Sequence, residues 1–335
     1  APNLLLGAAK DKPNEKLNIG IIGSGGRGSA NMRGVASENI VALCDVNGQT
    51  LAASQKKYPK AKAYFDWRKL LEDKSIDAVT VSTADHCHAL AAVAAMRAGK
   101  HVYCEKPLAH SVHEARVMRE TFAKSKVATQ MGTQIHATDN YRRVVELVQS
   151  GAIGPVREAH VWCSRTINPI GAPVLERQSP PDWFHWDEWQ GPAPDRYHNQ
   201  GYWKGGNLNW NRRWDYGNGV LGDMGSHLID LPWWALELNT PLTCEAHGPK
   251  ADAVACPPWM RVTWEHAARK GRAALEVPVK VVWYHGGRSK RDRPNIDTGI
   301  DLGKWFNGIL FVGDKGMLLA DYGKRILLPK EKFAG

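Results

Sequence analysis

The sequence lacks any apolar run that approaches the roughly 18 residues needed to span a membrane. It has six cysteines but no C-x-x-C pair and no short disulfide framework. It also shows no internal repeat and no low-complexity linker. These absences argue against a membrane span and against a scaffold built on cysteine. They leave a globular chain of 335 residues, which is long enough for two domains.

The formal net charge is +10, which on its own would suggest a nucleic-acid surface. The basic residues are dispersed, however, apart from the segment 288–293, which has the composition of a solvated loop. We therefore expect no nucleic-acid partner. A basic protein would still attract an anionic dinucleotide.

A glycine-rich stretch follows the first apolar run. Gly23, Gly25 and Gly28 have G-x-G-x-x-G spacing and precede a helix-compatible segment, with Gly26 and Arg27 inside the same turn. In such a turn the first glycine permits a tight bend, the second lets the backbone approach a pyrophosphate, and the third lets the helix pack closely on the strand. The pattern predicts a dinucleotide site at the N-terminus of the helix.

An acidic residue, Asp45, ends the next apolar strand, about 20 residues beyond the glycines. There a carboxylate would accept a hydrogen bond from a ribose 2′-hydroxyl and would repel a 2′-phosphate. We therefore expect NAD as the cofactor, although the positive charge of Arg27 would favour the 2′-phosphate of NADP. An ordinary glycine-rich turn is the alternative, and the agreement of strand, glycines, helix and acid disfavours it.

From residue 17 to about 135, short apolar strands alternate with helical segments. This alternation indicates right-handed βαβ crossovers and a parallel sheet. Asp66 and Asp85 are expected to cap helices, and Ser111 with Glu114 forms a capping-box pattern.

Past a helix expected at 139–150, the composition changes. Nine of the fourteen tryptophans lie between Trp162 and Trp234. Later segments predict further strands, at 273–283, 308–312 and 316–321. We expect an α/β protein with a tail at 1–16, a Rossmann parallel sheet domain at 17–135, and an α+β domain with a large open sheet at 136–335.

The tripeptide Glu105-Lys106-Pro107 directly follows a predicted strand, and a second motif places Asp223 and His227 four residues apart on a predicted helix. Together with the glycine motif, they resemble the glucose-fructose oxidoreductase, inositol dehydrogenase and rhizopine catabolism family over nearly the whole chain. The resemblance implies that Lys106 projects toward the reacting carbon, that Asp223 and His227 complete the site, and that a cis peptide bond precedes Pro107.

The resemblance also implies which further residues contact the cofactor. Thr83 and His88 lie in the loop and helix start after the strand at 77–82, where the family's cofactor-contacting loop is found. Glu105 and Lys106 are expected to contribute from the next strand end. A purely structural role remains open for the histidines at 86–88.

The chemistry of alcohol oxidation is consistent with these residues. It needs a hydride acceptor, a base for the hydroxyl proton, and positive charge to stabilise a developing alkoxide. A histidine side chain can exchange a proton near neutral pH, so His227 can be the base, and Lys106 can stabilise the alkoxide or relay the proton. Taken singly, Lys106 would be a strand-end surface lysine, Asp223 a helix cap and His227 a buried histidine. The joint occurrence of the motifs favours catalysis.

A metal site is the rival interpretation of this helix, because Asp223, His227 and Asp230 lie at i, i+4 and i+7. A lysine electrophile makes a metal unnecessary, and the histidines at 86–88 have no convincing ligand partner. We expect no metal.

The tryptophans suggest the substrate. Indole faces stack on sugar C–H surfaces, and indole N–H groups donate to hydroxyls. Between 183 and 215, six tryptophans are interleaved with asparagine, arginine and aspartate. We select Trp203, Arg212 and Trp214, with Asp223 and His227, as candidate substrate contacts; a core position is the alternative for each single tryptophan.

The sequence therefore favours an NAD-dependent oxidoreductase acting on a secondary alcohol or ketone of a sugar or glycoside. We expect a homo-oligomer, a dimer or tetramer, formed through the sheet of the second domain. One alternative is an NAD-dependent glycoside hydrolase that works by transient oxidation, elimination and re-reduction. The other is a non-enzymatic sensor of a dinucleotide or sugar.

The two ends of the chain suggest further expectations. Residues 1–9 lack an initiator Met and resemble the region after a twin-arginine export signal in exported family members. We expect a periplasmic or otherwise exported protein that keeps its NAD tightly bound, with a cytoplasmic enzyme as the alternative. Relatives usually continue past the strand at 316–321, so the end at Gly335 marks a shorter variant or an incomplete chain.

Overall fold

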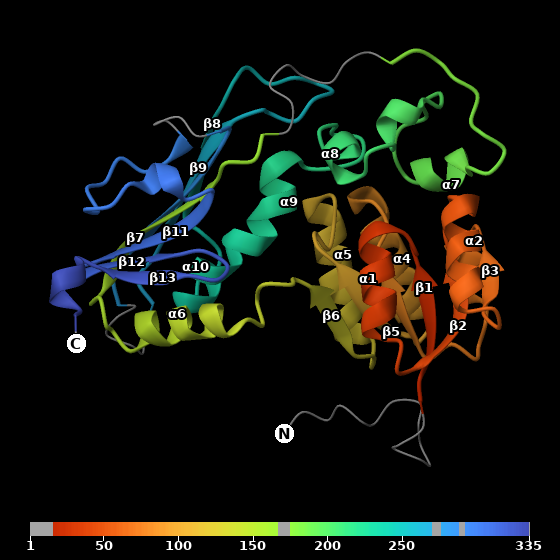
Figure 1. Ribbon diagram of the computed structural model, residues 1–335, viewed down its shortest axis with the longest axis horizontal. Coiled ribbons are helices and arrows are strands. Elements are labelled where there is room, and N and C mark those ends of the chain that lie inside the picture. The colour runs from red at the N-terminus through yellow and green to blue at the C-terminus, as the bar shows by residue number, and fades with distance from the viewer. Residues whose placement is uncertain (1–15, 167–174, 270–275, 288–291, 335) are drawn as a thin grey trace. The chain divides into compact units, whose positions relative to one another are not determined.

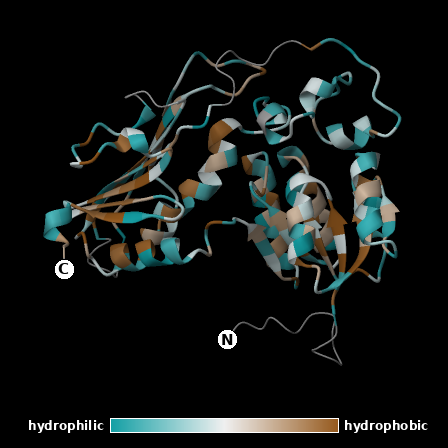
Figure 2. Ribbon diagram, in the orientation of Figure 1, coloured by the Kyte–Doolittle hydropathy of each residue, from teal (hydrophilic) through white to brown (hydrophobic). Residues whose placement is uncertain are grey.

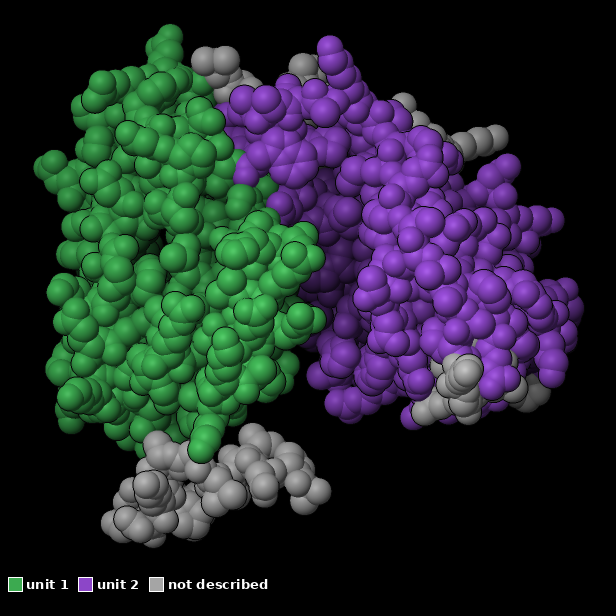
Figure 3. All heavy atoms as spheres, turned by 180° about the vertical axis from the view of Figure 1, so that it is seen from behind, with its two compact units in different colours: residues 1–132, 173–211, 215–217 green, residues 133–172, 212–214, 218–335 purple. Residues whose placement is uncertain are grey.

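The computed structural model describes residues 16–166, 175–269, 276–287 and 292–334. The segment on which the export hypothesis rests lies outside these residues, as do parts of the basic segment and of the strand expected at 273–283. The chain forms two compact units, shown in different colours in Figure 3. The first comprises residues 1–132, 173–211 and 215–217, and the second comprises residues 133–172, 212–214 and 218–335.

The first unit contains a parallel six-stranded sheet (Figure 1). Its strands, in sheet order, are β3 (Lys62–Tyr64), β2 (Asn39–Cys44), β1 (Asn18–Ile22), β4 (Ala78–Val81), β5 (His101–Glu105) and β6 (Thr129–Gly132). The helices between them are α1 (Gly26–Gly34), α2 (Gly48–Lys57), α3 (Trp67–Leu71), α4 (Asp85–Arg97) and α5 (Val112–Lys124). The central strands β1 and β4 are mostly apolar (Figure 2), as expected of strands covered by helices on both faces.

The helix starts agree with the sequence in two of three cases. Asp66 caps α3 by accepting from the Arg68 N–H at 2.8 Å, and Ser111 with Glu114 forms the predicted capping box of α5. The expectation that Asp85 caps α4 is wrong, because the helix begins one residue earlier and Ala84 occupies the cap position. Asp85 is instead buried in the first turn, where a carboxylate faces the positive end of the helix dipole.

The tryptophan-rich segment belongs to the first unit, although the sequence assigned it to the second domain. Backbone hydrogen bonds tie it to the loop after β2: Gly48 N donates to Trp183 O at 2.7 Å, and His185 N donates to Val46 O at 2.9 Å. The segment contains the short helices α7 (Trp186–Gln190) and α8 (Asn207–Trp210) and the 3₁₀ turn η1 (Gln200–Tyr202).

The second unit contains a mixed seven-stranded sheet. Its strands, in sheet order, are β13 (Arg325–Leu328), β12 (Gly316–Ala320), β11 (Asn307–Gly313), β7 (Val156–Cys163), β10 (Val279–His285), β9 (Met260–His266) and β8 (Thr243–His247). Only the β7–β10 pairing among these strands is parallel. The 3₁₀ turns η4 (Leu302–Lys304) and η5 (Lys330–Lys332) accompany the sheet.

The helices α6 (Asp139–Gln149), α9 (Gly219–Leu228) and α10 (Asp230–Ala235) pack on one face of this sheet. Alternate residues of β7 divide between the faces: Val161 packs with these helices, whereas Trp162 belongs to a second cluster with Leu310. The predicted fold class, a Rossmann parallel sheet followed by an α+β domain, is confirmed. No helix within the described ranges is both long enough and apolar enough to cross a membrane.

Candidate active site

The glycine loop joins β1 to α1, and its geometry requires glycine. Gly23 has φ +83°, and its N–H donates to Cys44 O at 2.8 Å. A Cβ on Gly28 would lie 1.8 Å from Gly23 O, so α1 can pack against β1 only without a side chain there. At Gly26 an added Cβ would meet no atom within 4 Å, so the backbone at the start of α1 faces open space. This arrangement fits a pyrophosphate at the N-terminus of α1.

Asp45, at the end of β2, is hydrogen-bonded to the same loop. Its Oδ2 accepts from Ser24 N at 2.9 Å and from Gly25 N at 3.2 Å, and its Oδ1 accepts from Asn47 N at 2.9 Å. Burial raises the pKa of Asp45, and these hydrogen bonds oppose that rise. The carboxylate therefore fixes the conformation of the glycine loop, a role that the spacing of the motif did not predict. Arg27, on the exposed side of the loop, lies at the start of α1.

The end of β5 is connected to α1 through a buried carboxylate. Asn31 on α1 donates from Nδ2 to Glu105 Oε1 at 2.9 Å and to Ser82 Oγ at 3.0 Å. Glu105 is buried, so its carboxylate fixes the backbone just before Lys106 relative to the helix that follows the glycines. Sequence analysis did not identify Asn31, because no motif marks it.

The Lys106–Pro107 peptide bond is cis, as the family resemblance implied. His88 lies behind this turn and is buried; its Nδ1 is 2.6 Å from Pro107 O and its Nε2 is 3.0 Å from Thr83 O. Burial lowers the pKa of His88, while its hydrogen bonds to the two carbonyls oppose that change. His88 thus bridges the loops after β4 and β5, and it positions Thr83 and the Lys106–Pro107 turn.

In the second unit, α9 presents Asp223 and His227 one turn apart. Both are buried, with 2% and 8% of their surfaces exposed. Arg165, just beyond β7, places Nη1 2.5 Å from Asp223 Oδ2. Tyr141 on α6 donates its hydroxyl to His227 O at 2.9 Å. The helix is therefore held by an ion pair to the Asp223 side chain and by a buried hydrogen bond to the His227 carbonyl.

Arg165 and Tyr322 are two residues of this region that sequence analysis missed. Tyr322 lies in the turn between β12 and β13, with its ring centroid 6.2 Å from that of His227. Neither residue belongs to a motif, and each is far from α9 in sequence. The one available signal for Arg165 was its place just after a strand end.

In the structure, Asp223, His227 and Asp230 are not arranged as a metal-binding group. Asp230 starts a separate helix, α10, and its Oδ2 is 2.8 Å from Nδ1 of the half-exposed His136. Within the part of the chain that the structure describes, no three histidine, cysteine, aspartate or glutamate residues are arranged to hold a metal ion.

The candidate sugar-binding residues have different surroundings. In the first unit, Trp203 stacks on Phe184 at 4.1 Å, and its Nε1 donates to His198 Nε2 at 3.0 Å, within a cluster of aromatic side chains. In the second unit, Trp214 is 40% exposed and donates from Nε1 to Asp252 O, and Arg212 is half-buried. Of the two tryptophans, Trp214 has the more exposed ring.

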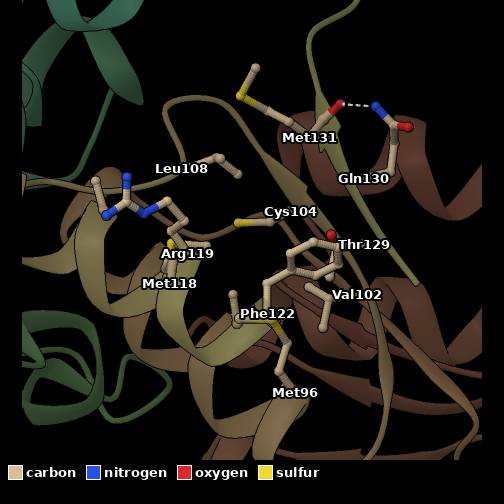
Figure 4. A pocket seen from close by; sticks show the side chains of 12 residues that line it. Met96, Val102, Cys104, Leu108, Met118, Arg119, Phe122, Thr129, Gln130 and Met131 are labelled. Atoms are coloured by element: carbon tan, nitrogen blue, oxygen red, sulfur yellow. Dashed lines mark hydrogen bonds between the residues drawn. The ribbon is translucent and has the colours of Figure 1, made fainter. Parts of the chain in front are cut away.

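The first unit also contains an apolar cavity of about 230 Å³ between α4, α5, β5 and β6 (Figure 4). The side chains of Met96, Cys104 and Phe122 point toward it, and Arg119 is the one charged residue among those that line it. It lacks the combination of proton-exchanging groups that alcohol oxidation needs. This cavity is therefore not the candidate active site.

Comparisons with known proteins agree with this geometry. Residues 17–133 match a family model described as an oxidoreductase family with an NAD-binding Rossmann fold. Residues 140–272 match the C-terminal alpha/beta domain of the same oxidoreductase family.

Curated relatives include inositol 2-dehydrogenase from Salmonella typhimurium, which is 35% identical over 150 residues, covering 43% of this chain and 45% of the relative. Levoglucosan dehydrogenase from Pseudarthrobacter phenanthrenivorans is 24% identical over 229 residues, covering 65% and 50%. The matches span about half the length of these relatives.

Solved structures share the fold over most of this chain. The WlbA dehydrogenase from Bordetella pertussis, in complex with NADH and UDP-GlcNAcA, has a TM-score of 0.64 at 15% identity, covering 93% of this chain and 80% of that one. Levoglucosan dehydrogenase in complex with NADH and levoglucosan has a TM-score of 0.60 at 19% identity, covering 92% and 74%. With both family models matched in order, the chain belongs to the glucose-fructose oxidoreductase, inositol dehydrogenase and rhizopine catabolism family, and its first unit contains the family's NAD-binding Rossmann domain.

Proposed function

We propose that this protein is an NAD-dependent oxidoreductase that interconverts a secondary alcohol and a ketone on a sugar, a glycoside or a related cyclic polyol. The observation that carries the proposal is the buried pair Asp223 and His227 on one turn of α9, held by Arg165. A buried histidine beside a carboxylate is suited to take up and release a proton. The names of the relatives, inositol and levoglucosan dehydrogenases, support the substrate class.

The cofactor site that we propose is the carboxyl edge of the first sheet. Gly23, Gly25, Gly26 and Gly28 would receive the pyrophosphate, and Asp45 would accept from the adenosine ribose. The rest of the cofactor site would be formed by Arg27, Thr83 and Glu105. His88 would act indirectly, through the two loops that it bridges. The bound nicotinamide would supply the hydride acceptor for the reacting carbon.

The remaining chemistry is assigned to three side chains. His227 takes the proton of the substrate hydroxyl during oxidation and returns it during reduction. Lys106 stabilises the negative charge that develops on the same oxygen. Asp223 orients the substrate and the imidazole, and its charge is balanced by Arg165. Trp203, Arg212 and Trp214 are proposed substrate contacts.

Two measurements test the proposal. An absorbance spectrum of the purified protein would reveal bound nicotinamide. The protein is then incubated with NAD and a panel containing myo-inositol, levoglucosan, glucose and an aryl glycoside. We expect a reduced nicotinamide and a ketone product from at least one polyol. Release of the aglycone without net reduction would instead support redox-neutral glycoside cleavage, and binding without turnover of any panel member would support a sensor.

A further inference from the structure

We propose that Tyr322 is a substrate-binding residue of the candidate active site, where its hydroxyl binds a second hydroxyl of the polyol next to the one that exchanges its proton with His227. This inference rests on the proposed function. It adds to the proposed substrate-binding residues one from the β12–β13 turn, which is far along the chain from α9.

The turn that carries Tyr322 is firmly held. Asn140 at the start of α6 donates from Nδ2 to Asp321 O at 2.8 Å and to Lys324 O at 3.1 Å. The Asp321 carboxylate accepts from Gly323 N at 2.9 Å and from Lys324 N at 2.8 Å. Because both sides of the turn are fixed, the position of the Tyr322 ring is set by the fold before any ligand binds.

The ring of Tyr322 is close to the proposed catalytic helix. It meets the imidazole of His227 edge to face, with centroids 6.2 Å apart and planes at 68°. Its hydroxyl also interacts electrostatically with Asp223 and Arg165. Four side chains from α9, the end of β7 and the β12–β13 turn therefore gather in one region of the second unit.

The Tyr322 hydroxyl is buried and has no hydrogen-bond partner among the residues that the structure describes. Leaving a buried hydroxyl without a partner is unfavourable, so such groups are rare outside functional sites. Two other tyrosines of this unit are satisfied within the protein: Tyr141 donates to His227 O, and Tyr284 lies 3.0 Å from His160 Nδ1. A substrate hydroxyl would satisfy Tyr322 in the same way.

The surroundings of Tyr322 also select the chemistry of its ligand. Burial raises the pKa of this phenol well above its usual value, so it remains neutral and can both donate and accept. The nearby charges of Asp223 and Arg165 act in opposite directions, so the surroundings favour neither an anionic nor a cationic ligand group at this point. A neutral hydroxyl of a polyol fits both properties.

The test compares Tyr322→Phe with Tyr284→Phe, the same substitution at a buried tyrosine whose hydroxyl has a protein partner. With the polyol that the wild type oxidises fastest, we expect Tyr322→Phe to raise KM at least tenfold while the dissociation constant for NAD changes less than twofold. Its melting temperature should not fall, because the removed hydroxyl has no partner in the protein. Tyr284→Phe should lower the melting temperature and leave KM unchanged.

Deoxy analogues of the accepted polyol complete the experiment. At the carbon whose hydroxyl Tyr322 binds, the deoxy substrate should lose kcat/KM at least tenfold with the wild type and show no further loss with Tyr322→Phe. An active wild type with an unchanged KM and a lower melting temperature in Tyr322→Phe would overturn the inference alone. A wild type that oxidises no polyol of the panel would overturn the proposed function and this inference with it.

Discussion

Asp223 shows how the second unit stabilises charge within its core. Its carboxylate is 2% exposed, and a buried carboxylate is stable only with a close positive group or several hydrogen-bond donors. Arg165 supplies that charge at 2.5 Å from a strand end. About a third of the arginine side chain remains exposed, so part of the pair is screened by solvent. The pair therefore positions Asp223 more than it stabilises the fold.

The first prediction concerns the two groups proposed to act on the reacting alcohol. Lys106→Ala and His227→Ala should each reduce kcat by about 10² or more, because each removes charge stabilisation or proton transfer in the transition state. The affinity for NAD should change little in both variants. Steady-state kinetics and a cofactor titration measure the two quantities. Near-full turnover in either variant on the true substrate would show that its assignment is wrong.

The second prediction concerns cofactor choice at Asp45. The wild type should bind NAD at least tenfold more tightly than NADP, because the carboxylate repels a 2′-phosphate. Asp45→Asn keeps an oxygen that can accept from Ser24 N and Gly25 N, but it removes the charge. This variant should retain NAD affinity and bind NADP about tenfold more tightly than the wild type does.

Asp45→Ala serves as the control for the loop. It removes the charge and the acceptor together, so it should also weaken NAD binding. Fluorescence titration of each variant with both cofactors separates the two effects. A wild type that binds NADP as tightly as NAD would contradict the role of Asp45 and would point to Arg27.

At the scale of elements, the contact between α1 and β1 leaves no room for a side chain at Gly28. Gly28→Ala places a Cβ 1.8 Å from Gly23 O and should lower the free energy of unfolding by about 3 kcal/mol or more. It should also abolish NAD binding. Gly34→Ala, at the other end of α1, meets no atom within 4 Å and should instead stabilise the protein by about 0.5 kcal/mol.

Denaturant unfolding of both variants, each followed by a cofactor titration, checks this difference. The two substitutions are chemically identical and lie in one helix, so helix propensity alone would give them the same sign. Equal stability of the two variants would mean that the glycine loop relaxes around the added methyl group.

The elements that the sequence predicted are those whose signals are local. Strand runs, helix caps such as Asp66, and the glycine motif depend on neighbours within a few residues. The contact of Asn31 with Glu105, the ion pair of Arg165 with Asp223, and the approach of Tyr322 to His227 join residues 58 to 95 positions apart. Such pairs follow from the arrangement of the strands, which spacing along the chain does not encode.

The tryptophan-rich segment shows the same limit of sequence-based prediction, here for a whole segment and not for a single pair of residues. Its composition suggested a sugar cleft in the second domain, but much of the aromatic surface packs into its own cluster in the first unit. Indole rings that fill a core and indole rings that bind a sugar have the same sequence signature. Only the surroundings of each ring distinguish the two uses: Trp186 is buried and stacks on Trp189, whereas Trp214 is 40% exposed.

At the scale of the whole molecule, we predict a loss of stability in acid. Burial lowers the pKa of His86 in the first unit and of His285 in the second to about 4, from an ordinary value of 6.5. The neutral imidazole of His285 also accepts from Trp283 Nε1 at 2.8 Å, which a protonated ring could not do. Well above pH 6.5 neither histidine is protonated in the folded or the unfolded state, so neither contributes to the pH dependence there.

Between pH 6.5 and 4 the unfolded chain takes up a proton at each position and the folded protein does not. Stability should therefore fall with decreasing pH by up to about 3 kcal/mol per histidine. Unfolding curves at pH 7.5, 6 and 4.5 measure the slope. His86→Gln and His285→Gln should each flatten it, whereas His113→Gln, at an exposed position on α5, should not. A slope unchanged in both buried-site variants would assign the acid sensitivity to other groups.

The division of the chain has a consequence for biosynthesis. The first unit is assembled from residues 1–132, 173–211 and 215–217, so the polypeptide passes between the units five times. During translation, the ribosome must deliver residue 217 before the first unit has all of its parts, and by then much of the second unit is still unsynthesised. A gene fragment ending at residue 132 would therefore encode the complete parallel sheet without the aromatic segment that closes over the loop after β2. A single protease cut near residue 133 would sever residues 1–132 from the rest of the chain, and the remaining segments of the first unit, 173–211 and 215–217, would stay covalently joined to the second unit.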